Sequence, residues 1–426
     1  MRVILIIICI VLTSCFYFPF EFTFLPNVNT KLMLAGIGIP IMVFHIIKMG
    51  KIVVSKEILI ASLIAIVFSL VGCYAVDINN SEDYAYATYI ISMWLWLSAS
   101  YTVCTLIAVV HGKLSIQLLI NYLVAVCLIQ CALALLIDFV PAVKLFVDRY
   151  FTTGITEFLN KVERLYGIGA TLDVAGVRFS AVLLMIAVLL SQDETVRHQP
   201  RLVALYIISF LLISGIGNMI SRTTLLGMVG GIFYLFLTTD FFSPTIKYAN
   251  LRLWGTVLVT VVAVFLFGAY FYQTNPEVRE LLRFGFEGFF NWVEKGEWRT
   301  DSTDKLNGTM WIWPDANDTR TWLIGKATFS DWFAVGTDIG YCRFIFYCGL
   351  LGLITFTLFF AYLSIALAYK FVEFKHLFLL LFLLLLINWF KVSTDIFLVY
   401  APFLAIGSPF LYKKYYTKML YHHHVN

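Results

Sequence analysis

Long runs of apolar residues, separated by short polar stretches, dominate the chain and indicate helices that cross a membrane. A spanning helix needs about 20 mostly apolar residues. The runs are continuous rather than alternating, which favours helices over the strands of a membrane barrel. We therefore predict an all-α, polytopic integral membrane protein with about twelve transmembrane helices. The twelve runs lie at residues 3–20, 32–47, 58–76, 86–110, 115–140, 173–191, 202–219, 224–240, 253–272, 341–369, 376–390 and 395–412.

The composition supports the membrane class and excludes others. The 426 residues are 61% hydrophobic and 13% charged, with a mean hydropathy of +0.86, whereas soluble domains are about 25% charged. The net charge of +4 is small, so no nucleic-acid partner is predicted. The stretch from Arg2 to Cys15 also has the basic and apolar regions of a signal peptide, and its "LTSC" resembles a lipoprotein processing box. A first transmembrane helix is the main interpretation.

The distribution of lysine and arginine predicts the orientation of the chain. With the N-terminus in the cytoplasm, the inner segments hold fourteen of these residues, and the short outer loops hold only Lys31, Arg222 and Lys391. Basic residues favour the cytoplasmic side, so both termini are expected there. The chain then divides into helices one to nine (1–272), a large outer loop (273–340), and helices ten to twelve with a cytoplasmic tail (341–426). Tryptophans in the loop, such as Trp311 and Trp322, argue against disorder.

Several cations are expected at the outer ends of the spans. Arg178 lies about one turn inside the sixth span, Arg222 lies in the turn between the seventh and eighth, and Arg343 lies just inside the tenth. Arg164 and Lys391 fall on the same side. A charge at mid-bilayer costs about 2.5–3.5 kcal/mol, and snorkelling to the headgroups is one explanation. Because the arginine fork binds phosphate in bidentate fashion, the pattern favours an anionic ligand such as a lipid diphosphate.

An outer-face base would have to be a carboxylate, because no histidine falls on the predicted outer side. Asp338 precedes Arg343 by five residues, and Asp173 precedes Arg178 by five. A helix N-cap is the alternative role for both aspartates. The aspartate pairs in "DSTD" (301–304) and "DAND" (315–318) are compatible with a divalent metal, but a solvated loop is favoured. We predict neither a metal nor a cofactor.

Four segments resemble the O-antigen and capsular-polysaccharide polymerase (Wzy-type) family. The segment "GTDIGYCRFIFYCGLLGLITF" (336–356) is similar to a family pattern that follows a large outer loop, Gly-x-Asp-x-Gly-Tyr-x-Arg and then Gly-x-x-Gly. The other three are "SRTTLLG" (221–227), "RLYGIGATLDVAGVRFS" (164–180) and "KVSTDIFL" (391–398).

The resemblance implies glycosyl transfer at the periplasmic face of a bacterial inner membrane. A growing glycan on undecaprenyl diphosphate would pass to one lipid-linked repeat unit, and the lipid diphosphate would leave. Expected partners are these lipid-linked glycans and membrane lipid, and the family allows a chain-length regulator protein as well. The expected catalytic residues are Arg222, Asp338 and Arg343. The expected substrate-binding residues are Arg164, Arg178 and Lys391.

Two other functions remain open from the sequence. The related O-antigen ligases usually carry a functional histidine in the large outer loop, and this chain has none there. An O-antigen ligase or another lipid-linked sugar transferase is therefore the second interpretation. Transport, by a lipid-linked oligosaccharide flippase or a solute carrier, is the third. A flippase needs cations near mid-membrane or in both halves of the protein, whereas the unusual cations of this chain are expected on one face.

Overall fold

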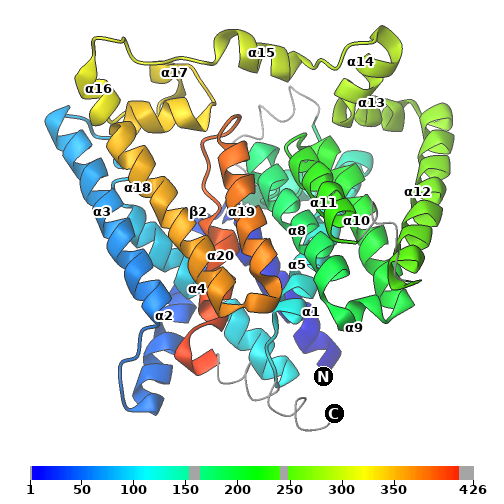
Figure 1. The fold of residues 1–426 in the computed structure, drawn as a ribbon, viewed down its shortest axis with the longest axis horizontal. Coiled ribbons are helices and arrows are strands. Elements are labelled where there is room, and N and C mark those ends of the chain that lie inside the picture. Colours follow the sequence, from blue (N-terminus) through cyan, green and yellow to red (C-terminus); the bar gives the residue numbers. More distant parts are fainter. Residues whose placement is uncertain (1, 153–163, 240–247, 412–426) are drawn as a thin grey trace. The chain divides into compact units, whose positions relative to one another are not determined.

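Helices make up most of the computed structural model, which describes residues 2–152, 164–239 and 248–411 (Figure 1). The chain forms two compact units. Unit 1 comprises Met1–Thr30 and Ile116–Arg299, and unit 2 comprises Lys31–Ser115 and Thr300–Asn426. Residues 273–340, called the outer segment after their predicted side of the membrane, contain only short helices, as their lack of a long apolar run predicts.

Unit 1 combines long apolar helices with a small sheet. Its helices are α1 (Arg2–Tyr17), α5 (Ile116–Phe139), α6 (Pro141–Tyr150), α8 (Leu172–Gln192), α9 (Glu194–Arg197), α10 (Pro200–Ile220), α11 (Thr224–Thr238), α12 (Tyr248–Thr274), α13 (Pro276–Gly285) and α14 (Glu287–Lys295). Its strands are β1 (Glu21–Phe22), β2 (Leu25–Asn29) and β3 (Phe151–Thr152). They form an antiparallel sheet in the order β2-β1-β3.

Helix α8 is the centre of unit 1. In its most apolar stretch of 18 residues, 94% of the residues are buried, because α5, α10 and α11 pack around the helix. A helix that is apolar on all sides is expected in such a place. The contact with α11 is close, since a Cβ atom on Gly227 would lie 2.2 Å from the Cα atom of Ser180. Small residues allow membrane helices to approach in this way, and here they fix α11 against α8.

Unit 2 contains the remaining helices and the second part of the outer segment. They are α2 (Thr30–Met49), α3 (Lys56–Ile78), α4 (Tyr89–His111), α15 (Asp301–Thr309), α16 (Thr319–Leu323), α17 (Trp332–Val335), α18 (Gly340–Lys370), the 3₁₀ turn η1 (Val372–Phe374), α19 (Lys375–Asn388) and α20 (Phe397–Ile406). Helix α18 packs against α3 and α19, and α4 packs against α20. Aromatic rings fill the contacts of α18, such as the stacked pair Phe68 and Phe356 with centroids 4.4 Å apart.

Helix α18 is broken at Gly349, whose φ of 63° lies in the left-handed region that glycine favours. The outer segment packs into this break. The backbone N–H of Lys326 donates to the carbonyl of Phe346 (2.6 Å), and that of Ala327 donates to Tyr347 (3.0 Å). These bonds satisfy carbonyls next to the interruption, as a broken membrane helix requires. The Gly-x-x-Gly pattern therefore marks the place where the loop contacts the helix.

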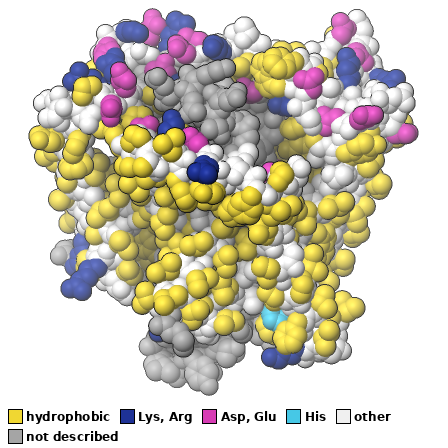
Figure 2. Space-filling model, turned by 180° about the vertical axis from the view of Figure 1, so that it is seen from behind, with side chains coloured by type: hydrophobic (Ala, Val, Ile, Leu, Met, Phe, Trp, Pro, Cys, Tyr) yellow, Lys and Arg dark blue, Asp and Glu magenta, His cyan; other side chains and the backbone are white. Residues whose placement is uncertain are grey.

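Exposed apolar side chains show where lipid would lie. Helix α12 has only 6% of its most apolar stretch buried, and side chains such as Val259 and Phe265 are 70% and 69% exposed. Hydrophobic side chains also cover much of the face seen in Figure 2. A water-soluble protein does not expose so much apolar surface, so the protein is embedded in a membrane.

Eight helices in the described residues are long and apolar enough to cross a membrane: α2, α3, α4, α5, α8, α10, α12 and α18. Each of the twelve predicted runs lies on a helix, but α1, α11, α19 and α20 have only 16, 15, 14 and 10 residues. These are shorter than the about 20 residues that a full crossing needs. Two of the predicted runs end in residues 240 and 412, outside the described residues. The polytopic helical class is confirmed, while the number twelve and the orientation stay predictions.

Candidate functional site

The turn that carries Arg222 is held against helix α8. The hydroxyl of Ser180 donates to the carbonyl of Thr223 (2.9 Å) and accepts from the backbone N–H of Gly227 (3.0 Å). A Cβ atom on Gly176 would lie 2.6 Å from the Ser221 hydroxyl oxygen, so α8 touches the turn here too. Hydrogen bonds and close packing against α8 therefore fix the backbone of the turn that carries Arg222.

Asp173 joins α8 to the same turn and is not the helix cap that was expected as one alternative. Its Oδ1 accepts hydrogen bonds from the hydroxyls of Ser221 (3.0 Å) and Thr223 (2.5 Å). The N-cap position belongs to Thr171, which makes no side-chain capping bond. The Asp173 carboxylate binds the turn rather than its own helix, because the two hydroxyls of the turn lie next to the first turn of α8. It adds a negative charge near Arg164.

Arg222 contacts the outer segment directly. Its guanidinium lies 4.6 Å from the centroid of the Phe284 ring, and its Nη1 forms an ion pair with Glu287. Phe284 is near the end of α13 and Glu287 begins α14. Helix α13 approaches the end of α10, since a Cβ atom on Gly285 would lie 3.2 Å from the backbone nitrogen of Met219. The first part of the outer segment therefore covers the Arg222 turn.

Arg164 converges on the same aromatic ring. Its guanidinium lies 5.0 Å from the Phe284 centroid, so Arg164 and Arg222 share one ring. Burial lowers the pKa of Arg164, the charge of Asp173 raises it, and the charge of Arg222 lowers it further. The Nε atom of Arg164 is buried and has no hydrogen-bond partner among the described residues. Because buried N–H groups normally have an acceptor, this donor is suited to a ligand.

Arg178 lies deeper on α8, where its side chain is 7% exposed. Its guanidinium lies 5.6 Å from the Phe18 ring centroid, and its backbone carbonyl accepts a hydrogen bond from the Tyr17 hydroxyl (2.9 Å). These contacts attach the segment after α1 to α8.

The other expected residues belong to unit 2. Arg343, in the first turn of α18, donates from Nη2 to the carbonyl of Phe329 and lies 4.4 Å from the centroid of that ring. Its Nε atom is also buried without a hydrogen-bond partner among the described residues. Lys391 is half-buried just after α19, and its backbone N–H donates to the carbonyl of Asn388 (2.9 Å).

Asp338 is not a helix cap either. The N-cap of α18 is Ile339, without a side-chain capping bond. Asp338 is exposed, and its Oδ1 accepts from the indole Nε1 of Trp332 (2.8 Å). It is near enough to Arg343 to interact with it electrostatically. The carboxylate is therefore accessible next to the start of α18.

Asp83, which the sequence interpretation did not single out, positions the contact of Arg343. Its Oδ2 accepts from the backbone N–H groups of Phe329 (2.6 Å) and Ser330 (2.5 Å), and its Oδ1 accepts from the Ser330 hydroxyl (2.8 Å). The segment that receives Arg343 is thus attached to the loop between α3 and α4. The only sequence signal for this role is that Asp83 lies in a short polar loop after a predicted span. That loop, "DINNSED" (77–83), was interpreted only as evidence for the orientation of the chain.

We expect the Asp83 attachment to depend on charge. Burial raises the pKa of the Asp83 carboxyl, but the hydrogen bonds from Ser330 and Phe329 outweigh this and leave the pKa below its ordinary value. A lowered folded-state pKa means that the stabilisation is complete above the ordinary value of about 4 and is lost as the pH falls through the folded value. Asp83→Asn should weaken the attachment at pH 7 by about 1 kcal/mol, since an amide nitrogen cannot replace Oδ2 as an acceptor.

Hydrogen exchange of the 329–330 amides measures this effect. Exchange should be several-fold faster in Asp83→Asn, and unchanged in the matched control Glu82→Gln, whose side chain is exposed. In the wild-type protein, protection of the two amides should fall only below about pH 4. Equal protection in both variants would show that the carboxylate does not hold the segment.

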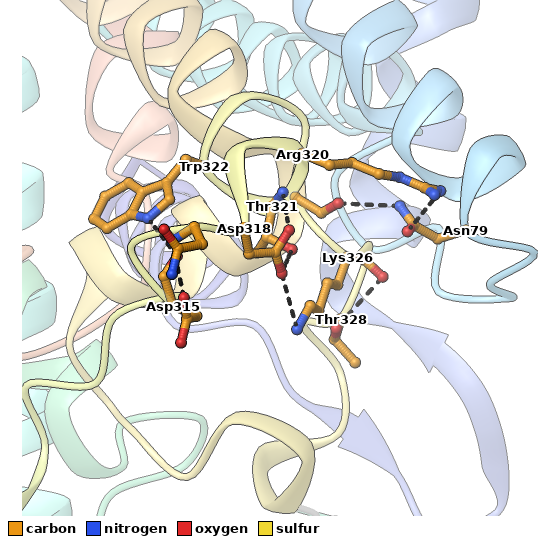
Figure 3. A network of polar contacts seen from close by, with 10 residues as sticks. Asn79, Asp315, Asp318, Arg320, Thr321, Trp322, Lys326 and Thr328 are labelled. Atoms are coloured by element: carbon orange, nitrogen blue, oxygen red, sulfur yellow. Dashed lines mark hydrogen bonds and ion pairs between the residues drawn. The ribbon is translucent and has the colours of Figure 1, made fainter.

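The aspartates of "DAND" have structural partners, drawn in Figure 3. Asp318 caps α16 by accepting from the backbone N–H (3.0 Å) and hydroxyl (2.6 Å) of Thr321, and it pairs with Lys326 at 3.5 Å. The carbonyl of Asp315 accepts from the indole of Trp322 (3.1 Å). Within the described residues, no group of three or more His, Cys, Asp or Glu side chains is placed to hold a metal ion.

Four of the expected site residues therefore lie in two clusters, with Arg164 and Arg222 in unit 1 and Asp338 and Arg343 in unit 2. In unit 1, Arg164 and Arg222 share the Phe284 ring. In unit 2, Arg343 and Asp83 hold the Phe329 backbone. Guanidinium groups that are partly buried beside aromatic rings are suited to bind phosphate. No protein-family model, curated protein or solved structure matches the chain in comparisons with each of these.

Proposed function

We propose that the protein is a glycosyltransferase that polymerises undecaprenyl-diphosphate-linked oligosaccharide repeat units into O-antigen or capsular polysaccharide. The reaction takes place at the periplasmic face of a bacterial inner membrane. The proposal combines the resemblance of four segments to the Wzy-type family with the chemistry of the arginine clusters.

The convergence of Arg164 and Arg222 on Phe284 is the observation that carries the proposal. Two cations held near each other in a partly buried place repel, and burial already lowers the pKa of Arg164. An anion that bridges them would relieve both effects. A lipid diphosphate supplies several oxygen acceptors, including one for the buried Nε of Arg164.

In the proposed reaction, a hydroxyl oxygen of the acceptor repeat unit attacks the anomeric carbon of the donor glycan. The bond from that carbon to the phosphate oxygen breaks, and the lipid diphosphate leaves with its negative charge. Arg164 and Arg222 offset this charge. The hydroxyl proton passes to a carboxylate, for which the exposed Asp338 beside Arg343 is the candidate. Arg178 and Lys391 remain proposed substrate-binding residues.

The test is a reaction with one defined substrate. Purified protein in lipid nanodiscs is incubated with a single undecaprenyl-diphosphate-linked repeat unit, and the products are separated by size. Polymerisation gives a ladder with one repeat per step. A ligase would leave this substrate unchanged until a separate acceptor is added, and a flippase would only move it across the bilayer. Either result contradicts the proposal.

A further inference from the structure

A pocket of about 240 Å³ opens beside the small sheet of unit 1. Three of its lining side chains come from one row of the sheet. Glu21 on β1 is in register with Asn29 on β2 on one side and with Thr152 on β3 on the other. Side chains of directly opposed residues lie on the same face of a sheet. The three polar groups therefore form one continuous edge of the pocket.

The other face of the sheet is aromatic. Phe22, the next residue on β1, is in register with Phe151, and their ring centroids are 5.7 Å apart. Because successive strand residues point to opposite faces, the sheet packs its aromatic face and presents its polar face. The polar row is thus arranged by the pairing of the strands.

A second wall comes from the segment that leads from Arg164 to α8, through Gly169 and Thr171. Gly169 has a φ of +72°, and a Cβ atom there would lie 2.4 Å from the carbonyl oxygen of Phe18. The segment is held in this close approach by Gln130, whose Nε2 donates to the carbonyl of Ile168 (2.9 Å). Thr171, the residue before α8, also lines the pocket. Both walls are therefore fixed by hydrogen bonds and close packing.

The lining chemistry fits a neutral ligand that is rich in hydroxyl groups. Glu21, Asn29 and the two threonines bring a carboxylate, a carboxamide and two hydroxyls to the lining, which Pro19, Phe20 and Gly169 complete. No lysine or arginine lines it, so the pocket is not built for phosphate. Its volume is below the about 300–1,000 Å³ typical of sites for drug-sized ligands, which suits one sugar ring.

The pocket and the arginines are parts of the same short segments. Residues 164–171 begin at Arg164 and end at Thr171. Phe18 is the residue before the pocket segment 19–21. The guanidinium of Arg178 lies 5.6 Å from the centroid of the Phe18 ring. We propose that this pocket binds one sugar residue of a lipid-linked glycan, next to the arginines that hold its diphosphate. The inference rests on the proposed function and adds the site that recognises the sugar.

The test separates sugar binding from diphosphate binding. The full-length protein in nanodiscs is titrated with two probes: the repeat-unit oligosaccharide released from its lipid, and undecaprenyl diphosphate without sugar. The variant is Thr152→Val with Thr171→Val, which removes two hydroxyls at nearly constant shape. Thr171 makes no capping bond that the change would break. The exposed Thr274, outside the pocket, provides the control Thr274→Val.

The double variant should bind the oligosaccharide about ten-fold more weakly, from the loss of two hydrogen bonds, and bind undecaprenyl diphosphate as the wild type does. Unchanged oligosaccharide binding would overturn the pocket assignment and leave the proposed function standing. The same holds if both ligands weaken together, since the pocket would then only support the arginines. If the wild-type protein binds the lipid diphosphate and not the oligosaccharide, the pocket proposal also fails. Binding of neither probe would contradict the proposed function itself.

Discussion

Replacing Arg222 with lysine should slow polymer formation by on the order of 10²–10³-fold, the range seen when one preorganised donor to a developing charge is lost. Lysine can keep the ion pair with Glu287, so folding should be preserved. It cannot reproduce the planar fork that binds two phosphate oxygens at once. The measurement is the initial rate of ladder formation by purified protein at matched concentration.

Arg299→Lys is the matched control for this change. Like Arg222, Arg299 pairs with a glutamate, Glu297, but its side chain is 62% exposed, so its replacement should leave the rate unchanged. A normal rate for Arg222→Lys would mean that the positive charge alone suffices. In that case the guanidinium only anchors Glu287 and Phe284, and the proposed role on the diphosphate is wrong.

Asp338→Asn should reduce the rate by about 10²–10⁴-fold, the usual contribution of a general base. The asparagine oxygen can still accept the hydrogen bond from Trp332, so the local structure should be retained. An amide cannot take the proton from the acceptor hydroxyl. Ladder formation is measured at matched membrane abundance.

Asp331→Asn serves as the control for Asp338→Asn. Asp331 caps α17 with its Oδ1 on the backbone N–H of Phe333 (2.9 Å), and asparagine is an equally good cap. This variant should keep its activity. If Asp338→Asn stays within a few-fold of the wild type, the carboxylate only binds Trp332, and the base must be sought among other carboxylates.

The apolar runs were sufficient to place the helices, because each run is continuous and much longer than a strand. They did not show where a helix is interrupted. The run 341–369 contains the break at Gly349, which arises from contact with the outer segment rather than from a local loss of apolar character. The small sheet was missed as well, because strands of two to five residues are too short for an alternating pattern to stand out.

Arg164 and Arg222 meet on one aromatic ring, and the sequence placed both beside spans on the same predicted side. Their common partner Phe284 was not predictable, because it is more than 60 residues away from Arg222 in a segment without periodicity. The capping roles of Asp173 and Asp338 were wrong for a related reason. Cap assignments depend on knowing the helix start to within one or two residues. In both cases the carboxylate instead accepts hydrogen bonds from other side chains, which are distant in sequence for Asp173 and near for Asp338.

Binding of undecaprenyl diphosphate to purified protein tests the central claim most directly, that the Arg164 and Arg222 cluster holds the leaving group. Arg164→Gln should weaken this binding by about 10–100-fold, as expected for charge-assisted hydrogen bonds. Arg149→Gln, at an exposed arginine of the same unit, should bind like the wild type. Equal affinity of the wild-type protein and Arg164→Gln would contradict the account.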